Sequence, residues 1–288
     1  MHTEPSGFEP SATVPHGPEG AWHRGTWHTR ALPGPLAWVV VGLALVASTT
    51  GLLVPAVYRD NALVTAAFRG NDVVTLFVAV PVLVATLLEA RRRPTLALLG
   101  RLGMLLYMFY NYVFYLYGAA FNVLFLVYVA LVVLSGFGLA SGLVAVDAEE
   151  LTRRFRAGAP ARSVGAYLVG FALLLGSLWT AISLSFVATG VVPLAITQTG
   201  HPTGVVFAAD LTMLVPVLLG SGLLLYRRQP WGYVLAPIVL LKASTYGMAM
   251  IAMSALAGLG ADPILPLWAG LTLGCVVSTG LLLGHLEK

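Results

Sequence analysis

The chain has 288 residues, of which 58% are hydrophobic and only 10% are charged, and its mean hydropathy is +0.86. Soluble globular proteins carry about 25% charged residues. The 16 basic and 12 acidic side chains cannot cover a water-facing surface of this size, which excludes an ordinary soluble enzyme. The pI near 9.3 does not indicate nucleic-acid binding, because the positive charges form short clusters between apolar runs.

The first 34 residues are rich in Pro, Gly, Ser and His and show no apolar period, which predicts a disordered cytoplasmic tail over 1–34. The tail contains four histidines whose spacing matches no zinc-binding pattern: His2, His16, His23 and His28. A single cysteine, Cys275, cannot form an internal disulfide or a thiolate metal cluster. We therefore predict neither a metal site nor a cofactor.

Eight apolar segments follow in residues 35–288, each long enough to cross a hydrocarbon core about 30 Å thick as a helix. Their predicted boundaries are 36–58, 72–89, 96–117, 121–145, 164–188, 206–226, 231–255 and 264–284. The fold class that follows is all-α, a polytopic transmembrane helical bundle of about eight spans. The predicted partner of such a protein is the lipid bilayer.

The basic residues predict the orientation of these spans. With the N-terminus inside, thirteen of them fall in inner segments: Arg24, Arg30, Arg91, Arg92, Arg93, Arg101, Arg153, Arg154, Arg156, Arg162, Arg227, Arg228 and Lys288. Only Arg59 and Arg69 fall outside, so the positive-inside rule places both termini in the cytoplasm. The excess of Arg over Lys hints at a GC-rich genome, and we expect a bacterial cytoplasmic (inner) membrane.

An ordered set of landmarks recurs in the two halves of the chain. The matched pairs are Pro55 and Pro193, Asp72 and Asp210, Pro81 and Pro216, Pro94 and Pro230, and Tyr110 and Tyr246. They suggest two four-span repeats, 36–145 and 164–284, related by a pseudo-twofold axis along the membrane normal. The alternative is chance matching between segments of similar composition. A true duplication would make the interface between the halves the natural place for a binding site.

Ionisable side chains at membrane depth are costly and persist mainly when they are paired or face protein or water. Lys242 lies eleven residues beyond Trp231 at the inner face, which places it about 16 Å deep, near the midplane. Asp210 lies about 9 Å further out, and we propose it as the partner of Lys242. Alternatively, Asp210 caps its helix near the outer surface, and capping is the favoured interpretation of Asp72 after Gly70.

The third span carries an aromatic run in which Tyr107, Tyr110 and Asn111 recur at helical spacing. An aromatic belt does not explain tyrosines that lie about 10–15 Å below the end of the span. These side chains either pack helices together or line a polar pocket. The predicted ligand-binding residues are accordingly Lys242, Asp210, Tyr110, Asn111, Tyr246 and Tyr107.

Two stretches, GLLVPAVYRDN at 51–61 and YNYVFYLYGAAFNVLFLVYVALVVLSGF at 110–137, carry a family resemblance. Through them the chain resembles a family of uncharacterised bacterial multi-pass integral membrane proteins. The resemblance implies only the membrane class and brings no activity, ligand or site residue.

Three functions remain open from the sequence. The first is binding or transport of a small ligand through a polar site between the two repeats. The second is an accessory or sensory membrane protein whose polar residues only hold the bundle together. The third is an outer-face enzyme acting on a lipid-linked substrate, for which Asp72, His201, Tyr112 and Asp210 are the available acid–base groups. No histidine lies within a span, so an enzyme is the less favoured hypothesis.

Overall fold

The computed structural model describes residues 34–258 and 265–287, and it confirms an all-α bundle with eight helices long and apolar enough to cross a membrane in this part of the chain. The predicted tail over 1–34 lies almost entirely outside the described residues. The spanning helices are α1 (Gly34–Leu53), the continuous run α2 (Ala62–Val74), η2 (Thr75–Ala79) and α3 (Val80–Leu88), α4 (Pro94–Gly118), α5 (Phe125–Val144), α7 (Ala161–Thr189), the run α9 (Val205–Ala209), η4 (Asp210–Leu214) and α10 (Val215–Tyr226), α11 (Pro230–Leu256) and α12 (Leu265–Leu283). The protein is therefore a multi-pass membrane protein.

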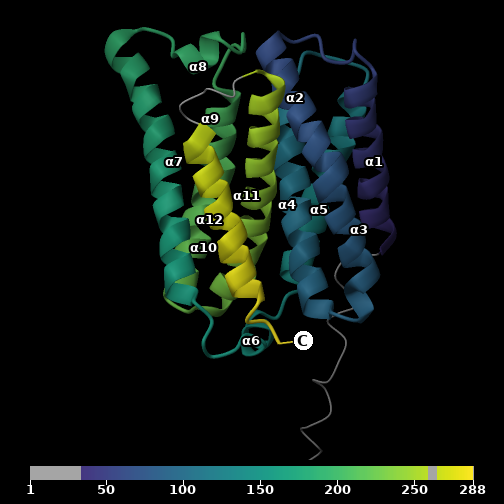
Figure 1. The fold of residues 1–288 in the computed structure, drawn as a ribbon, viewed down its shortest axis with the longest axis vertical. Helices are drawn as coiled ribbons and strands as arrows, with labels where there is room; N and C mark the ends of the chain where they lie inside the picture. Colours follow the sequence, from purple (N-terminus) through teal and green to yellow (C-terminus); the bar gives the residue numbers. More distant parts are fainter. Residues whose placement is uncertain (1–33, 259–264, 288) are drawn as a thin grey trace, which may run out of the picture.

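Shorter helices mark the two ends of the bundle (Figure 1). A 3₁₀ turn, η3 (Glu89–Arg91), and α6 (Ala148–Arg153) lie at the end predicted to be cytoplasmic, and α8 (Leu194–Thr197) lies at the opposite end. The C-terminal residues return to the α6 end, where the Arg156 N–H donates to the His285 carbonyl at 2.9 Å. Helix α6 is a short helix in the connection between α5 and α7.

The second span begins ten residues earlier than predicted, and the predicted cap at Asp72 is wrong. The residue that caps α2 is Asn61, whose side chain accepts from the Val64 N–H at 3.0 Å. Asp72 lies in the helix interior and is 1% exposed. Gly70 and Asn71 resembled a helix start, but Asn71 continues the helix and donates its amide to the Ala67 carbonyl at 2.9 Å.

The first span ends at Leu53 rather than at residue 58. Pro55 follows two residues later and cannot donate a backbone hydrogen bond, so the helix stops before it. The chain then forms a short connection that brings Tyr58 back against the bundle, where it is buried.

The prolines inside the second and sixth spans, Pro81 and Pro216, stand in the same local geometry. Each follows a five-residue π-helix, η2 before Pro81 and η4 before Pro216. In η2 the N–H of Val80 donates to the carbonyl of Thr75, and in η4 the N–H of Val215 donates to the carbonyl of Asp210. A proline removes a backbone donor and crowds the preceding turn, and a wider turn accommodates it. This recurrence adds a structural landmark to the sequence pairs, and duplication of the halves stays a prediction.

Helix α11 lies at the centre of the bundle (Figure 1) and packs against α2 and α4 of the first half as well as α10 and α12 of the second. Its approach to α2 is close because Gly70 has no side chain. A Cβ at Gly70 would lie 2.7 Å from the Met253 Cα on α11. Small residues permit such close backbone contact between membrane helices.

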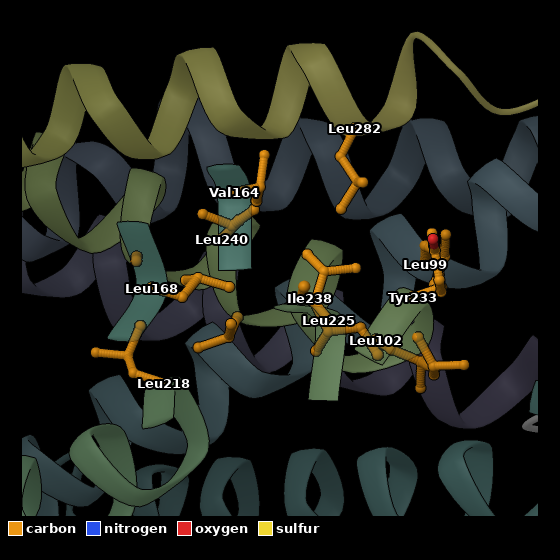
Figure 2. Close-up of a cluster of buried hydrophobic side chains, with 14 of the residues drawn as sticks. Leu99, Leu102, Val164, Leu168, Leu218, Leu225, Tyr233, Ile238, Leu240 and Leu282 are labelled. Carbon is orange, nitrogen blue, oxygen red and sulfur yellow. The ribbon is translucent and has the colours of Figure 1, made fainter. Parts of the chain in front are cut away.

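Around the inner half of α11, the helices of the second half and α4 of the first half form a dense apolar core (Figure 2). Leu168, Leu218 and Leu225 are fully buried there. Gly222 lets α10 meet α7, since a Cβ at Gly222 would lie 2.9 Å from the backbone nitrogen of Val169. The inner half of α7 is held tightly against the bundle by this contact.

The outer half of α7 is packed quite differently. Most of its residues from Ser177 onward are exposed, and Val187 is 79% exposed. Helix α7 also makes little contact with α12. The outer half of α7 therefore leaves space beside α12.

Candidate functional site: a cavity in the second half

A cavity of about 280 Å³ occupies that space and is bordered by α7, α8, α9, η4, α11 and α12. Its walls are mostly apolar and aromatic, and they include Phe171, Leu175, Trp179, Met250 and Trp268. The lining comes from the second half alone, so the cavity lies within one four-span unit rather than between the two units, where the sequence analysis placed a site. Lys242 and Asp210 both line it.

Asp210 accepts hydrogen bonds on both carboxylate oxygens. The Tyr110 hydroxyl donates to Oδ1, and Trp179 Nε1 donates to Oδ2 at 2.8 Å. Trp179 is held for this contact by stacking on Phe207, with ring centroids 4.2 Å apart. Asp210 is 4% exposed and makes no capping bond to a helix N-terminus, so the structure does not support the capping alternative.

Lys242 is 1% exposed and lies in the same region of the bundle. Its Nζ sits 3.3 Å from the centroid of the Tyr110 ring and 4.5 Å from that of Tyr246, a cation–π arrangement. Nζ has no hydrogen-bond acceptor among the described residues, and no ion pair joins it to Asp210. The predicted pairing is therefore indirect: Tyr110 contacts Lys242 with its ring face and Asp210 with its hydroxyl.

Two of the predicted site residues lie elsewhere. Tyr107 shares a hydrogen bond of 2.9 Å with the Thr75 hydroxyl, on the side of α4 that faces η2. Asn111 is fully buried, and neither its amide nitrogen nor its oxygen has a partner in the described structure. Neither residue lines the cavity. Four predicted residues, Lys242, Asp210, Tyr110 and Tyr246, come together.

Asp72 is the residue of the first half that matches Asp210, and aromatic rings fill the space beside it. Its Oδ2 accepts from the Tyr58 hydroxyl at 2.5 Å and its Oδ1 from the Tyr115 hydroxyl at 2.9 Å. The ring of Phe68 packs between them, with centroids 5.1 Å from Tyr58 and 4.7 Å from Tyr115. Burial, with the nearby Asp72 carboxylate, raises the pKa of Tyr58 far above its ordinary value, so this hydroxyl remains a neutral donor.

The hypothetical outer catalytic set is not assembled at the surface. Asp72 and Tyr112 are buried, and Asp210 faces the internal cavity, while His201 lies in the outer connection and is partly exposed. Across residues 34–258 and 265–287, no three His, Cys, Asp or Glu side chains are grouped to hold a metal ion. The candidate site therefore consists of Lys242, Asp210 and the aromatic side chains around them.

Several site residues were not predicted from the sequence. Trp179 lies deeper in its span than a residue of an aromatic belt, and this depth is the sequence signal of an interior partner. Thr272 and Cys275 line the cavity from α12. Thr272 packs against Gly247, where a Cβ would lie 2.9 Å from the Thr272 Cβ.

The chain matches no protein-family model, no curated protein and no solved structure. A function can therefore be inferred only from the cavity and from the groups that line it.

Proposed function

We propose that this membrane protein binds a small, electrically neutral and mostly apolar molecule in the cavity between α7, η4, α11 and α12. The observation that carries the proposal is a cavity of about 280 Å³ with apolar and aromatic walls beside a buried lysine that has no acceptor within residues 34–258 and 265–287. Ligand pockets are typically about 300–1,000 Å³ with apolar walls and few polar groups. The volume of this cavity lies just below that range, so the ligand is small.

The charges of the site favour a neutral ligand. Lys242 and Asp210 are one basic and one acidic group, both near the same cavity and not in direct contact. An anion attracted to Lys242 is repelled by Asp210, and a cation attracted to Asp210 is repelled by Lys242. In a low-dielectric interior such repulsions are large. A neutral molecule with one polar group avoids both.

The packing of α7 supports access from the bilayer. The outer half of this helix is exposed from Ser177 onward, while the inner half is fixed against α10 by the contact at Gly222. An apolar molecule dissolved in lipid meets the space between α7 and α12 without first crossing water.

The test compares three probes with the same chain length: decanol, decanoate and decylamine. A ligand that binds only the folded protein raises its thermal stability, by about 2.7 kcal/mol at 100 times Kd. We expect decanol to raise the melting temperature of the protein in nanodiscs more than either charged probe. A larger effect of decanoate or decylamine contradicts the charge argument.

A pair of variants separates cavity binding from effects on the bilayer. Ala243 lines the cavity, and Ala243→Leu fills part of it. Leu173 is 60% exposed and lies outside the cavity, so Leu173→Ala is the control. We expect decanol to stabilise the control as it does the parent, and to lose this effect in Ala243→Leu. Equal stabilisation of both variants refutes binding in the cavity and favours an accessory role.

A further inference from the structure

We propose that Lys242 is a covalent attachment site that forms an imine with an apolar aldehyde bound in the cavity. The inference rests on the proposed function and names its ligand class: a neutral carbonyl compound with an apolar body. No other nucleophilic nitrogen is found among the residues lining this cavity.

The position of Lys242 fits this chemistry. A lysine in an apolar pocket is a recognised nucleophile toward carbonyl compounds, because desolvation favours the neutral amine. Lys242 is 1% exposed, its Nζ has no acceptor in the part of the chain that the structure describes, and its side chain borders the cavity. A structural lysine at this depth would be expected to have an anion or a carbonyl oxygen as its partner.

The aromatic contacts determine what must move. Nζ rests over the rings of Tyr110 and Tyr246, so the amine has to rotate away from these faces to reach a bound carbonyl carbon. The four methylene groups of the side chain allow this rotation. No hydrogen bond to Nζ has to be broken first.

The reaction balances without an oxidant or reductant. Lys242 first releases one proton from its ammonium form, and the neutral nitrogen then attacks the aldehyde carbon and forms a C–N bond. The carbonyl oxygen leaves as water with the two remaining hydrogens of the amine. The product is a C=N bond to Lys242. When the imine nitrogen takes up a further proton, it becomes a cation inside the membrane.

Asp210 supplies the counter-charge for that cation. Its carboxylate lines the same cavity and is held in place by Tyr110 and Trp179. Hydrogen bonds from two neutral donors fix a carboxylate without cancelling its charge. The free lysine has no such direct pairing, whereas an imine extending into the cavity places its nitrogen nearer to the space that Asp210 faces.

The chain has few primary amines, which makes a test of imine formation specific. Lys242 and Lys288 are its only lysines, and the N-terminal amine is the only other primary amine of the chain. The folded protein in nanodiscs is incubated with trans-cinnamaldehyde and treated with sodium cyanoborohydride, which reduces an imine to a stable amine. Intact mass and peptide mapping then locate each adduct.

We expect one adduct on the Lys242 peptide in the parent protein and in the matched control Lys288→Arg. The adduct on that peptide is lost in Lys242→Arg. Ala243→Leu retains the lysine but reduces the cavity, so labelling of Lys242 should fall at least tenfold. This variant tests the role of the cavity even if Lys242→Arg fails to fold. In Asp210→Asn, the absorption band of the unreduced imine should shift to shorter wavelength, because without the nearby carboxylate the imine nitrogen loses its proton.

Two results distinguish the failure of this inference from failure of the proposed function. If adducts appear only on Lys288 and the N-terminus while decanol still stabilises the parent but not Ala243→Leu, imine formation is refuted and neutral-ligand binding stands. If the adduct is absent and decanol has no cavity-dependent effect, both are refuted. Labelling of Lys242 that is equal in Ala243→Leu and the parent also refutes a reaction inside the cavity.

Discussion

Replacing Tyr110 with Phe tests the central contact of the site. The variant removes the hydroxyl that donates to Asp210 and leaves the aromatic ring beneath Lys242 Nζ. The cation–π contact is largely kept, since Phe also presents a ring face. The change in stability therefore reports the hydrogen bond to the carboxylate.

The size of the effect follows from burial and charge. A hydrogen bond to a charged group contributes about 1.5–3 kcal/mol, although bonds between membrane helices average about 0.6 kcal/mol and reach about 1.7 kcal/mol. Tyr110 is 2% exposed, so water cannot replace the lost donor easily. We expect Tyr110→Phe to lower the free energy of unfolding by about 1.5 kcal/mol.

Tyr107→Phe is the matched control because it removes a buried tyrosine hydroxyl from the same helix. That hydroxyl bonds to neutral Thr75, and its loss should cost only about 0.5–1 kcal/mol. Equilibrium unfolding in mixed detergent micelles, with fluorescence as the signal, measures both variants. Combined with Asp210→Asn, Tyr110→Phe should show a coupling energy of about 1 kcal/mol and Tyr107→Phe almost none.

A smaller loss in Tyr110→Phe than in Tyr107→Phe contradicts this reasoning. So does the absence of coupling between Tyr110 and Asp210. Either result means that the carboxylate does not depend on the tyrosine, and the indirect link from Asp210 to Lys242 then loses its basis.

Three further predictions concern the fold. Gly70→Ala places a methyl group against the backbone of α11 and should lower thermal stability by about 1–3 kcal/mol, whereas Gly42→Ala meets no atom within 4 Å and should not destabilise the protein. Asn61→Ala removes the cap of α2 and should lower the free energy of unfolding by about 1 kcal/mol, measured by equilibrium unfolding in the same micelles. In intact cells, a cysteine replacing His201 should react with an impermeant maleimide, while one replacing Arg156 should react only after permeabilisation; the reverse pattern refutes the predicted orientation.

The spans could be predicted because composition alone identifies segments that must avoid water. The error at the second span shows where that reasoning fails. Gly70, Asn71 and Asp72 are polar or helix-breaking when only the sequence is considered, and they resemble a loop. In the structure Gly70 makes a close contact with α11 and Asp72 accepts from two tyrosine hydroxyls, which are tertiary contacts, whereas Asn71 bonds within its own helix to the Ala67 carbonyl.

The candidate site was predicted in part for a similar reason. Depth along the chain identified Lys242 and Asp210 as groups without a simple place, and the matched landmarks identified Tyr110 and Tyr246. Tyr107 was assigned to the same stripe because it lies three residues from Tyr110. Residues at this spacing point about 60° apart around a helix axis, enough for one to face η2 and the other η4. Only the positions of neighbouring helices decide which.

The two buried aspartates show why one half carries a candidate site and the other does not. Asp72 and Asp210 each accept hydrogen bonds from two aromatic side chains, so the carboxylates themselves are equally well satisfied. What differs is the space beside them. Phe68 and its neighbouring tyrosine rings fill it in the first half, whereas the outer part of α7 stands away from α12 in the second. Because buried polar groups that are satisfied and densely packed stabilise a fold without needing a ligand, the Asp72 cluster is explained by structure alone. Around Asp210 the same hydrogen bonds adjoin a cavity and a lysine without an acceptor among the described residues, and this is the space in which we propose that a ligand binds.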